Sequence, residues 1–435
     1  MDYEFSITNY ELRITNFQLR ITDYGLRIFN YKMNKKQKII PALRFSEFEE
    51  EGEWEVKELG GFLLKSPEYG INAAAVPYSE NLPTYLRITD ISTSGKFLTN
   101  KKVSVAKNVT EDNYLEKGDI VLARTGASVG KSYKYRDIDG KLVFAGFLIR
   151  IKPDTNKLNS ELLFQFLSTE HYWKWVKFTS ARSGQPGING KEYASMPVFI
   201  PPTLKEQKKI ASCLSSLDAV IESITEKLKL LKNHKKGLLQ QLFPAEGETK
   251  PKVRFEEFVN DGEWGKKELG ECLDYLQPTK YLVKSTDYDK TYPTPVLTAG
   301  KTFILGYTDE KEGIFDTNLP VIIFDDFTTA SKFVDFPFKA KSSAMKLLLS
   351  KNETNIRFIY GVIQNIKFEV STHKRHWISV YSKLKILVPS LKEQQKIADC
   401  LSSLDDLIEF QSEKIKSLKE HKKGLMQQLF PSTTA

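Results

Sequence analysis

Residues 123–132 (ARTGASVGKS) come closest in this sequence to a catalytic motif. Glycine, lysine and serine in this order can cradle a nucleotide phosphate, but the phosphate loop GxxxxGK[ST] has four residues between its glycines. Gly126 and Gly130 are separated by three. The spacing therefore favours a basic turn that approaches a phosphate backbone over a nucleotide site. Its donors would be Arg124, Ser128 and Lys131.

Other catalytic patterns are missing from the sequence. The histidines do not join cysteines or acids at metal-ligand spacing, and there is no GxSxG nucleophile motif. No Asn-Pro-Pro-aromatic or Asp-Pro-Pro-aromatic stretch is present, so the chain does not look like an amino-methyltransferase. We expect no catalytic residue, no metal site and no cofactor in this chain.

Three further stretches carry side chains suited to DNA. Arginine and glutamine can read base edges, whereas lysine and serine contact phosphates. Residues 180–193 (SARSGQPGINGKEY) contribute Arg182, Gln185, Asn189 and Lys191. Residues 324–333 (FDDFTTASKF) contribute Thr328, Thr329, Ser331 and Lys332, and residues 372–377 (THKRHW) contribute His373, Lys374, Arg375 and His376. The alternative is that these are ordinary solvated polar loops.

The elements that would position these loops are duplicated. Residues 202–244 return as residues 389–431, identical at 31 of 43 positions. Apolar residues recur every three or four positions, the pattern of a coiled-coil seam. The seam residues are Ile210, Leu214, Leu217, Ile221, Ile224, Leu228 and Leu231 in the first copy, and Ile397, Leu401, Leu404, Ile408, Ile415 and Leu418 in the second.

The ends of both helices are marked in the sequence. Thr203 and Ser390 stand three residues before Glu206 and Glu393, which predicts a capping box in each copy, and a proline closes each copy. Lys235 and Lys422 interrupt both seams, and Gln411 interrupts the second, so we expect the pairing to loosen toward the lysines. We predict that the two helices pack on each other. The alternative is that each covers its own neighbouring domain.

A second repeat precedes each variable block. Residues 41–60 return as residues 251–270, and we call them the lead segments. Their matched tryptophans, Trp54 and Trp264, could stack on bases, but a shared scaffold favours core anchors. The predicted parts are residues 33–60 (first lead), 61–201 (recognition domain 1), 202–244 (helix 1), 245–270 (second lead), 271–388 (recognition domain 2) and 389–435 (helix 2 and tail).

The variable blocks do not resemble each other, and each reads as a small α/β domain. We predict strands at residues 119–124, 142–151, 197–200, 321–324 and 383–388, and helices at 160–170 and 355–364. The expected fold class is therefore mixed α and β: two recognition domains separated by two long antiparallel coiled-coil helices, with an internal pseudo-two-fold repeat.

Composition limits the partners and the compartment. The 435 residues carry a net charge of +9, which favours a polyanionic partner. Three scattered cysteines are too few for a disulfide framework, so a reducing cytoplasm is expected. No apolar run is long enough to cross a membrane. Residues 1–32 contain the near-exact repeat ITNYELR, ITNFQLR, ITDYGLR and read as an upstream extension before Met33; a short amphipathic docking segment is the alternative.

The duplicated helices (LKEQ, KIA, CLSSLD, QQLFP), the lead segments (RF, EF, GEW, LG) and the stretches GDIVLARTGASVGK and RHWISVYSKLKI closely resemble the specificity (S) subunit of Type I restriction-modification systems. The likeness covers nearly all of residues 33–435. It implies that two recognition domains each read half of a bipartite DNA site, while antiparallel helices form a spacer and dock two methyltransferase subunits, which restriction subunits join. Methylation, translocation and cleavage, with S-adenosylmethionine, ATP and magnesium, would belong to those partners.

Two other classes stay open on the sequence alone. The chain could be the recognition part of a self-contained restriction-methylation enzyme, which would need a fused catalytic region. It could also be a coiled-coil adaptor that binds proteins and no DNA.

Overall fold

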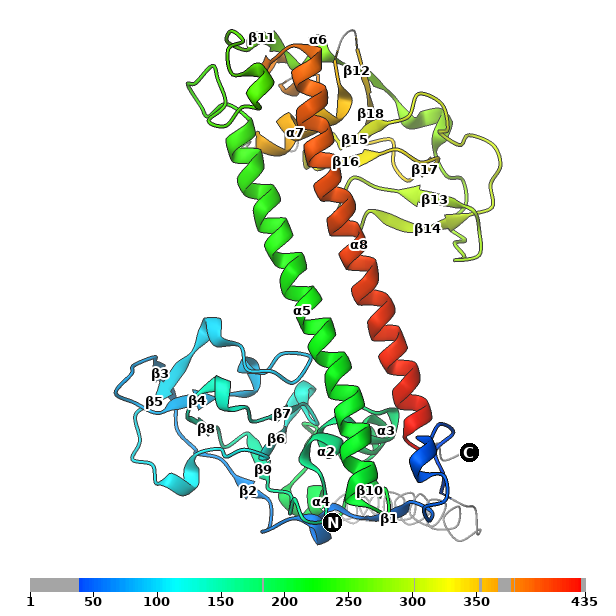
Figure 1. Ribbon diagram of the computed structural model, residues 1–435. Helices are drawn as coiled ribbons and strands as arrows, with labels where there is room; N and C mark the ends of the chain where they lie inside the picture. The colour runs from blue at the N-terminus through cyan, green and yellow to red at the C-terminus, as the bar shows by residue number, and fades with distance from the viewer. Residues whose placement is uncertain are drawn as a thin grey trace, which may run out of the picture. The chain divides into compact units, whose positions relative to one another are not determined.

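The long helices organise the structure. A computed structural model describes residues 39–181, 184–300, 302–351, 354–366, 377–378 and 380–431. It divides into unit 1, residues up to Ile221 together with those from Ser417 onward, and unit 2, Glu222–Lys416. The boundaries fall inside the helices α5, Leu204–Leu242, and α8, Leu391–Leu429. Each unit therefore contains the start of one long helix and the end of the other (Figure 1).

Unit 1 is built on two four-stranded sheets, β2-β9-β6-β7 and β3-β5-β4-β8, and the short pair β1-β10. The strands are β1 Glu55–Glu58, β2 Glu68–Tyr69, β3 Ala75–Pro77, β4 Thr84–Leu86, β5 Val103–Val105, β6 Ile120–Ala123, β7 Ser132–Lys134, β8 Leu142–Phe144, β9 Leu148–Ile151 and β10 Pro197–Ile200. All residues of β6 and β9 are buried, consistent with their place in the middle of a sheet. Only the β4–β8 pairing is parallel among the strand pairs of this unit.

Short helices follow the sheets of unit 1: α2 Ser160–Phe166, α3 Glu170–Thr179 and α4 Gly190–Ala194. The single helix predicted at residues 160–170 is thus two. Thr169 accepts a hydrogen bond from the Tyr172 N–H and so caps a new helix at this point.

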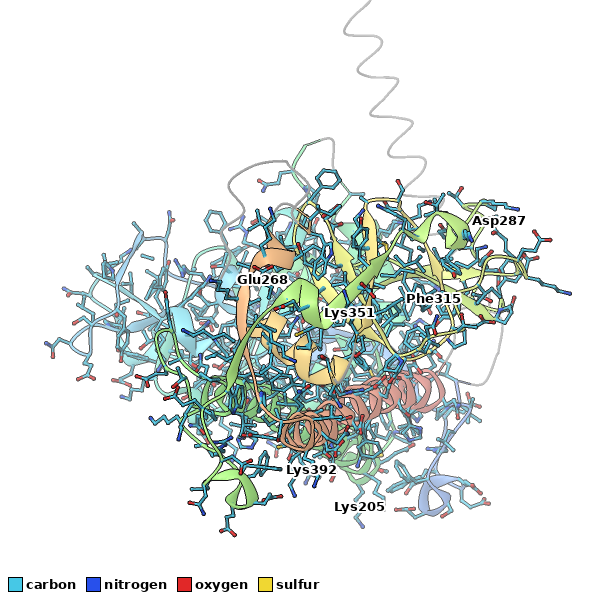
Figure 2. All side chains as sticks on the ribbon, turned by 90° about the horizontal axis from the view of Figure 1, so that it is seen from above. Lys205, Glu268, Asp287, Phe315, Lys351 and Lys392 are labelled. Atoms are coloured by element: carbon cyan, nitrogen blue, oxygen red, sulfur yellow. The ribbon has the colours of Figure 1, made fainter. Side chains whose placement is uncertain are left out.

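Unit 2 has the sheets β12-β18-β15-β16 and β14-β13-β17 and the pair β11-β19. The strands are β11 Gly265–Glu268, β12 Leu273–Leu276, β13 Thr294–Leu297, β14 Ile304–Thr308, β15 Val321–Asp325, β16 Ser331–Val334, β17 Lys339–Ala340, β18 Met345–Ser350 and β19 Lys385–Val388. Its helices besides the long ones are α6 Leu269–Cys272 and α7 Ile356–Asn365. Phe315, labelled in Figure 2, is 1% exposed in a core cluster to which both the four-stranded and the three-stranded sheet contribute, whereas Asp287 lies on the surface.

The two units follow the same path despite their unlike blocks. In each, one four-stranded sheet, β2-β9-β6-β7 or β12-β18-β15-β16, places its first strand beside its last. The two middle strands follow, joined by one turn (β6–β7 or β15–β16). In each, the second sheet contains one parallel pair, β4–β8 or β13–β17. The sequence repeat of the leads and helices therefore extends to the topology of the blocks between them.

The cores contain the ends of the long helices. In unit 1, Trp54 packs with Ile210 and Leu214 from the start of α5 and with Leu429 and Phe430 from the end of α8. In unit 2, the same arrangement joins Trp264, Ile397, Leu401, Leu242 and Phe243. The prediction that both tryptophans are core anchors is confirmed, since they are 2% and 3% exposed.

The strand predicted at residues 142–151 and the two capping boxes are also wrong. Residues 142–151 form two strands, because a turn at Ala145 separates β8 from β9. In both expected capping boxes the hydroxyl receives the N–H of the glutamate, but the carboxylate bonds to an arginine and a tryptophan instead.

The lysines in the seams have acidic partners. Lys422 bonds to both oxygens of Asp218 in unit 1, at 2.6 and 2.7 Å, and Lys235 pairs with Asp405 in unit 2. Within each unit the end of one long helix is thus tied to the start of the other by an ion pair. The seam residues named above are buried or half-buried throughout, and so is Gln411.

Within the described ranges, no helix has both the length and the apolar character that crossing a bilayer demands.

Candidate nucleic-acid interface

A buried ion pair fixes each domain to its helix. In unit 1, Arg44 donates from Nε and Nη2 to the two oxygens of Glu206, both at 2.8 Å, and the Trp54 Nε1–H donates to the same carboxylate at 3.1 Å. In unit 2, Arg254 and Trp264 hold Glu393 in the same way, at 2.7, 2.7 and 3.3 Å. The hydrogen bond to glutamate raises the pKa of both arginines.

A second contact repeats within the unlike blocks. Asn159 caps α2 with its side chain, and its backbone N–H donates to Gln207 of α5 at 2.8 Å. Asn355 caps α7, and its N–H donates to Gln394 of α8 at 2.9 Å. Each block therefore contacts its long helix at the equivalent glutamine. The β6–β7 turn of unit 1 and the β15–β16 turn of unit 2 also occupy equivalent positions in their sheets.

The β6–β7 turn of unit 1 carries Arg124, Ser128 and Lys131. Gly126 and Gly130 have φ angles of +73° and +86°, a region that favours glycine. A 3₁₀ turn, Gly126–Ser128, lies between them. The two glycines are therefore needed for the backbone conformation of the turn. This requirement explains why the sequence resembles a phosphate loop.

The loop before α4 meets this turn. The Gly126 N–H donates to the Pro186 carbonyl and the Ile188 N–H to the Arg124 carbonyl, both at 2.9 Å. Gln185 is exposed, and its Nε2 lies 3.2 Å from where a Cβ on Gly126 would stand. Two stretches that are 60 residues apart in the sequence, both predicted to contact DNA, therefore form one surface.

Aromatic residues complete this surface. The Arg124 guanidinium lies over the Tyr69 ring, 4.9 Å from its centroid. The Tyr69 hydroxyl accepts a hydrogen bond from the Gly190 N–H at 3.0 Å, and the ring is 49% exposed. Phe147, whose carbonyl accepts the Arg124 N–H at 3.0 Å, is 62% exposed. We call Tyr69, Arg124, Phe147 and Gln185 the unit 1 cluster.

Other predicted residues of unit 1 have structural partners or stand apart. The Lys131 ammonium donates to the Ile91 carbonyl. Asn189 caps α4, accepting the Glu192 N–H at 2.9 Å. Ser128 is half-buried within the turn, and Lys191 is exposed on α4. Arg182 lies outside the described residues.

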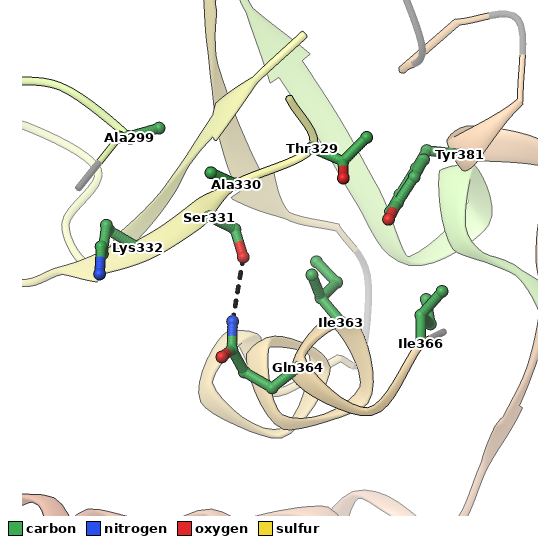
Figure 3. A pocket seen from close by; sticks show the side chains of 10 residues that line it. Ala299, Thr329, Ala330, Ser331, Lys332, Ile363, Gln364, Ile366 and Tyr381 are labelled. Carbon is green, nitrogen blue, oxygen red and sulfur yellow. Dashed lines mark hydrogen bonds between the residues drawn. The ribbon is translucent and has the colours of Figure 1, made fainter. Parts of the chain in front are cut away.

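In unit 2, the β15–β16 turn brings the predicted residues together. The Asp325 side chain accepts the Thr328 N–H at 2.7 Å, and Thr329 has a φ of +58°. Thr329, Ser331 and Lys332 line an open pocket of about 360 Å³, completed by Gln364 and Tyr381 among others (Figure 3). Thr328 is exposed beside them.

The walls of the pocket come from α7 and from the 3₁₀ turn Tyr381–Lys383. Gln364 Nε2 donates to Ser331 Oγ at 3.1 Å, drawn as the dashed line in Figure 3. Burial raises the pKa of Tyr381, and its hydrogen bond with Thr329 opposes that rise. His373, Lys374, Arg375 and His376 lie outside the described residues.

Trp377, the first described residue after that segment, is anchored in the core. Its backbone N–H donates to Asp326 Oδ1 at 2.8 Å, and its ring packs against Phe324. Asp326 and Lys346 form an ion pair at 3.4 Å in which both side chains are 1% exposed. Trp377 is therefore fixed by both its backbone and its ring.

Sequence reasoning missed Tyr69, Phe147, Gln364 and Tyr381. Tyr69 and Phe147 stand in strand-like or turn sequences without a charge pattern, and their exposure depends on neighbouring strands. Tyr381 has a signal in the sequence, because it lies in the stretch RHWISVYSKLKI, which is part of the family resemblance.

Comparison with known proteins agrees with the duplicated architecture. A family model described as "Type I restriction modification DNA specificity domain" matches twice, over residues 51–233 and 261–420. The chain is 56% identical over 133 residues to the Type I restriction enzyme EcoR124I/EcoR124II specificity subunit of Escherichia coli. This match covers 29% of the chain and only about a third, 33%, of the length of that relative. It is 24% identical over 419 residues to the MjaVIII specificity subunit of Methanocaldococcus jannaschii, covering 86% and 91% of the two.

The fold agrees with a solved structure as well. The crystal structure of the Type-I restriction-modification system S subunit from M. genitalium covers 91% of this chain and 100% of its own, with a TM-score of 0.64 at 15% identity. At that identity the likeness concerns the fold. Because the family model matches most of the chain in two copies, the protein belongs to the family of Type I restriction-modification specificity subunits, the non-catalytic subunits of those complexes.

Proposed function

We propose that this chain is the DNA-reading subunit of a Type I restriction-modification complex, and that it reads a bipartite, asymmetric DNA site with one half-site per unit. The observation that carries the proposal is the repeated mounting: Arg44, Glu206 and Trp54 in unit 1 and Arg254, Glu393 and Trp264 in unit 2 hold unlike blocks on matching helices. Two different surfaces in equivalent positions suit two different half-sites.

We propose further that the long helices set the unread gap between the half-sites. Each spans 39 residues, about 58 Å at 1.5 Å per residue. Dimeric DNA readers place their half-sites about one helical turn apart, roughly 34 Å. Helices of this length are sufficient for such spacing, and both are anchored in folded cores at their ends.

The surface chemistry favours DNA over a protein-only adaptor. The net charge of +9 attracts a polyanion. In unit 1 an arginine, an exposed glutamine and two exposed aromatic rings adjoin each other, and in unit 2 Lys332 stands beside threonine and serine hydroxyls. These side chains supply base-edge and phosphate contacts.

Two copies of a methyltransferase subunit are the proposed direct partners, and restriction subunits would join through them. Val220 and Leu407 occupy equivalent places in the duplicated helices, and both are exposed, at 46% and 47%. Paired apolar positions of this kind suit two copies of one partner. S-adenosylmethionine, ATP and magnesium would be bound by the partners.

The test is to sequence DNA methylation in a host with and without this gene, using three versions of the chain. The wild type should add a bipartite motif. A version lacking residues 223–229 and 411–417, one heptad from each helix, keeps the apolar spacing and should shorten the gap by about three base pairs, since seven residues span about 10 Å. A version with residues 271–388 replaced by another block should change one half-site only.

The proposal fails if no motif depends on the gene. The gap-setting role fails separately if the heptad deletion alters the half-site sequences and leaves the gap unchanged.

A further inference from the structure

Arg124 differs from the other arginines in its partners. Every other described arginine has a carboxylate oxygen within 4 Å; these are Arg44, Arg87, Arg136, Arg150, Arg254 and Arg357. Arg124 pairs with no carboxylate in the described part of the chain. Its guanidinium makes one long hydrogen bond, from Nη1 to the Gly146 carbonyl at 3.5 Å. Most of its donors are therefore available to a ligand.

The Arg124 side chain is nevertheless held in place. It lies over the Tyr69 ring at 4.9 Å, and the Tyr69 hydroxyl is fixed by the Gly190 N–H. Its Nε is buried and has no hydrogen-bond partner. A ligand from solvent can thus reach only the terminal Nη groups. The backbone on both sides is fixed too, because the Arg124 N–H and carbonyl bond to Phe147 and Ile188.

A rigid, unpaired arginine fork suits one kind of DNA acceptor best. An arginine fork can hold a phosphate with two donors, but a phosphate can be contacted from many directions and a lysine point charge also binds it. A base edge needs two donors at a fixed spacing, and arginine bonding to O6 and N7 of guanine is the commonest such contact. Stacking on an aromatic ring lowers the entropy lost when the fork binds.

The surroundings of Arg124 agree with a place in a groove. Exposed Gln185, suited to an adenine edge, adjoins the same turn. The exposed Phe147 ring offers an apolar contact for a thymine methyl group. The Lys131 ammonium on the same turn bonds to the Ile91 carbonyl.

We propose that Arg124, positioned by Tyr69, reads a guanine in the major groove of the half-site bound by unit 1. This inference rests on the proposed function. It assigns one base to one side chain: the unit 1 half-site contains a G·C pair, and the preference of the protein for this pair depends on the Arg124 guanidinium.

The experiment uses the full chain assembled with its methyltransferase partner. The wild-type motif is first obtained from methylation sequencing, and the block swap of residues 271–388 shows which half-site belongs to unit 1. Binding is then measured for duplexes that carry each of the four base pairs at every position of that half-site. The variants are Arg124→Lys, Arg124→Ala and Tyr69→Ala, with Lys174→Ala, at an exposed position of α3, as the control.

We expect Arg124→Lys and Arg124→Ala to lower the preference for guanine at one position by about 5- to 150-fold, with the other half-site and the gap unchanged. Tyr69→Ala should weaken the same preference, because the fork loses its support. Lys174→Ala should leave all base preferences intact. Thermal unfolding of each variant shows whether it is folded.

The inference is overturned if the unit 1 half-site contains no G·C pair, or if Arg124→Lys keeps every base preference and only weakens binding uniformly, as a phosphate contact would. Either result leaves the proposed function standing, since the wild type would still read its motif. A wild type that reads no motif removes both.

Discussion

The buried pair between Arg44 and Glu206 should control the stability of unit 1. Arg44→Ala removes two hydrogen bonds of 2.8 Å from Glu206 and leaves the Trp54 N–H as its remaining partner. The two side chains are 6% and 1% exposed, so the carboxylate cannot be rescued by water. Breaking a buried pair by removing one partner costs about 3–5 kcal/mol, and we expect a loss in this range.

The same surface provides a matched control. Lys209 and Glu47 also join α5 to the lead segment, but both are about half exposed, at 49% and 46%. Exposed pairs contribute about 0–1 kcal/mol. Lys209→Ala should therefore destabilise unit 1 by at least about 2 kcal/mol less than Arg44→Ala does. This difference corresponds to roughly 30-fold in the equilibrium constant for opening.

Native-state hydrogen exchange is the suitable assay, because a chain with two units need not unfold in one step. The Leu43 and Trp54 amides, which bond to Gln428 and Ile39, report on unit 1, and the Val253 amide, which bonds to Gln241, reports on unit 2. Arg44→Ala should speed exchange in unit 1, and Arg254→Ala should speed it in unit 2. Equal effects of Arg44→Ala and Lys209→Ala would refute the reasoning.

Two further substitutions test the β6–β7 turn. Lys131→Met should destabilise unit 1, since the Ile91 carbonyl loses its donor. It should leave the salt dependence of DNA binding, measured by salt titration, unchanged. If Lys131 contacted a phosphate, the substitution would instead reduce the slope of log affinity against log salt by about 1. Gly130→Ala should lower the free energy of unfolding by at least about 1 kcal/mol, because the φ of +86° is strained for alanine and the new Cβ would stand 2.8 Å from Val176. Denaturant unfolding measures this loss. Gly140→Ala, where φ is +75° but no atom lies within 4 Å, is the control that separates the clash from the strain.

The sequence alone determined the features that repeat. Duplicated helices, lead segments and core tryptophans follow from periodicity and self-similarity, since a long amphipathic helix must bury its stripe against the same partners wherever its sequence recurs. Strands such as β10 were found because short runs of buried β-branched and aromatic residues favour a sheet.

Only the tertiary structure decided what each polar residue does. Glu206 matched a capping box, yet its carboxylate is taken by Arg44 from 162 positions away. Lys422 interrupted a seam, yet Asp218 neutralises it. Lys131 and Arg124 stand seven residues apart on one turn. The Lys131 ammonium bonds to the Ile91 carbonyl, whereas the Arg124 guanidinium lies over the Tyr69 ring and makes one long hydrogen bond, to the Gly146 carbonyl. The physical reason is that a charged or polar group bonds to whatever the fold brings within about 3 Å, and for these residues the partners come from distant parts of the chain.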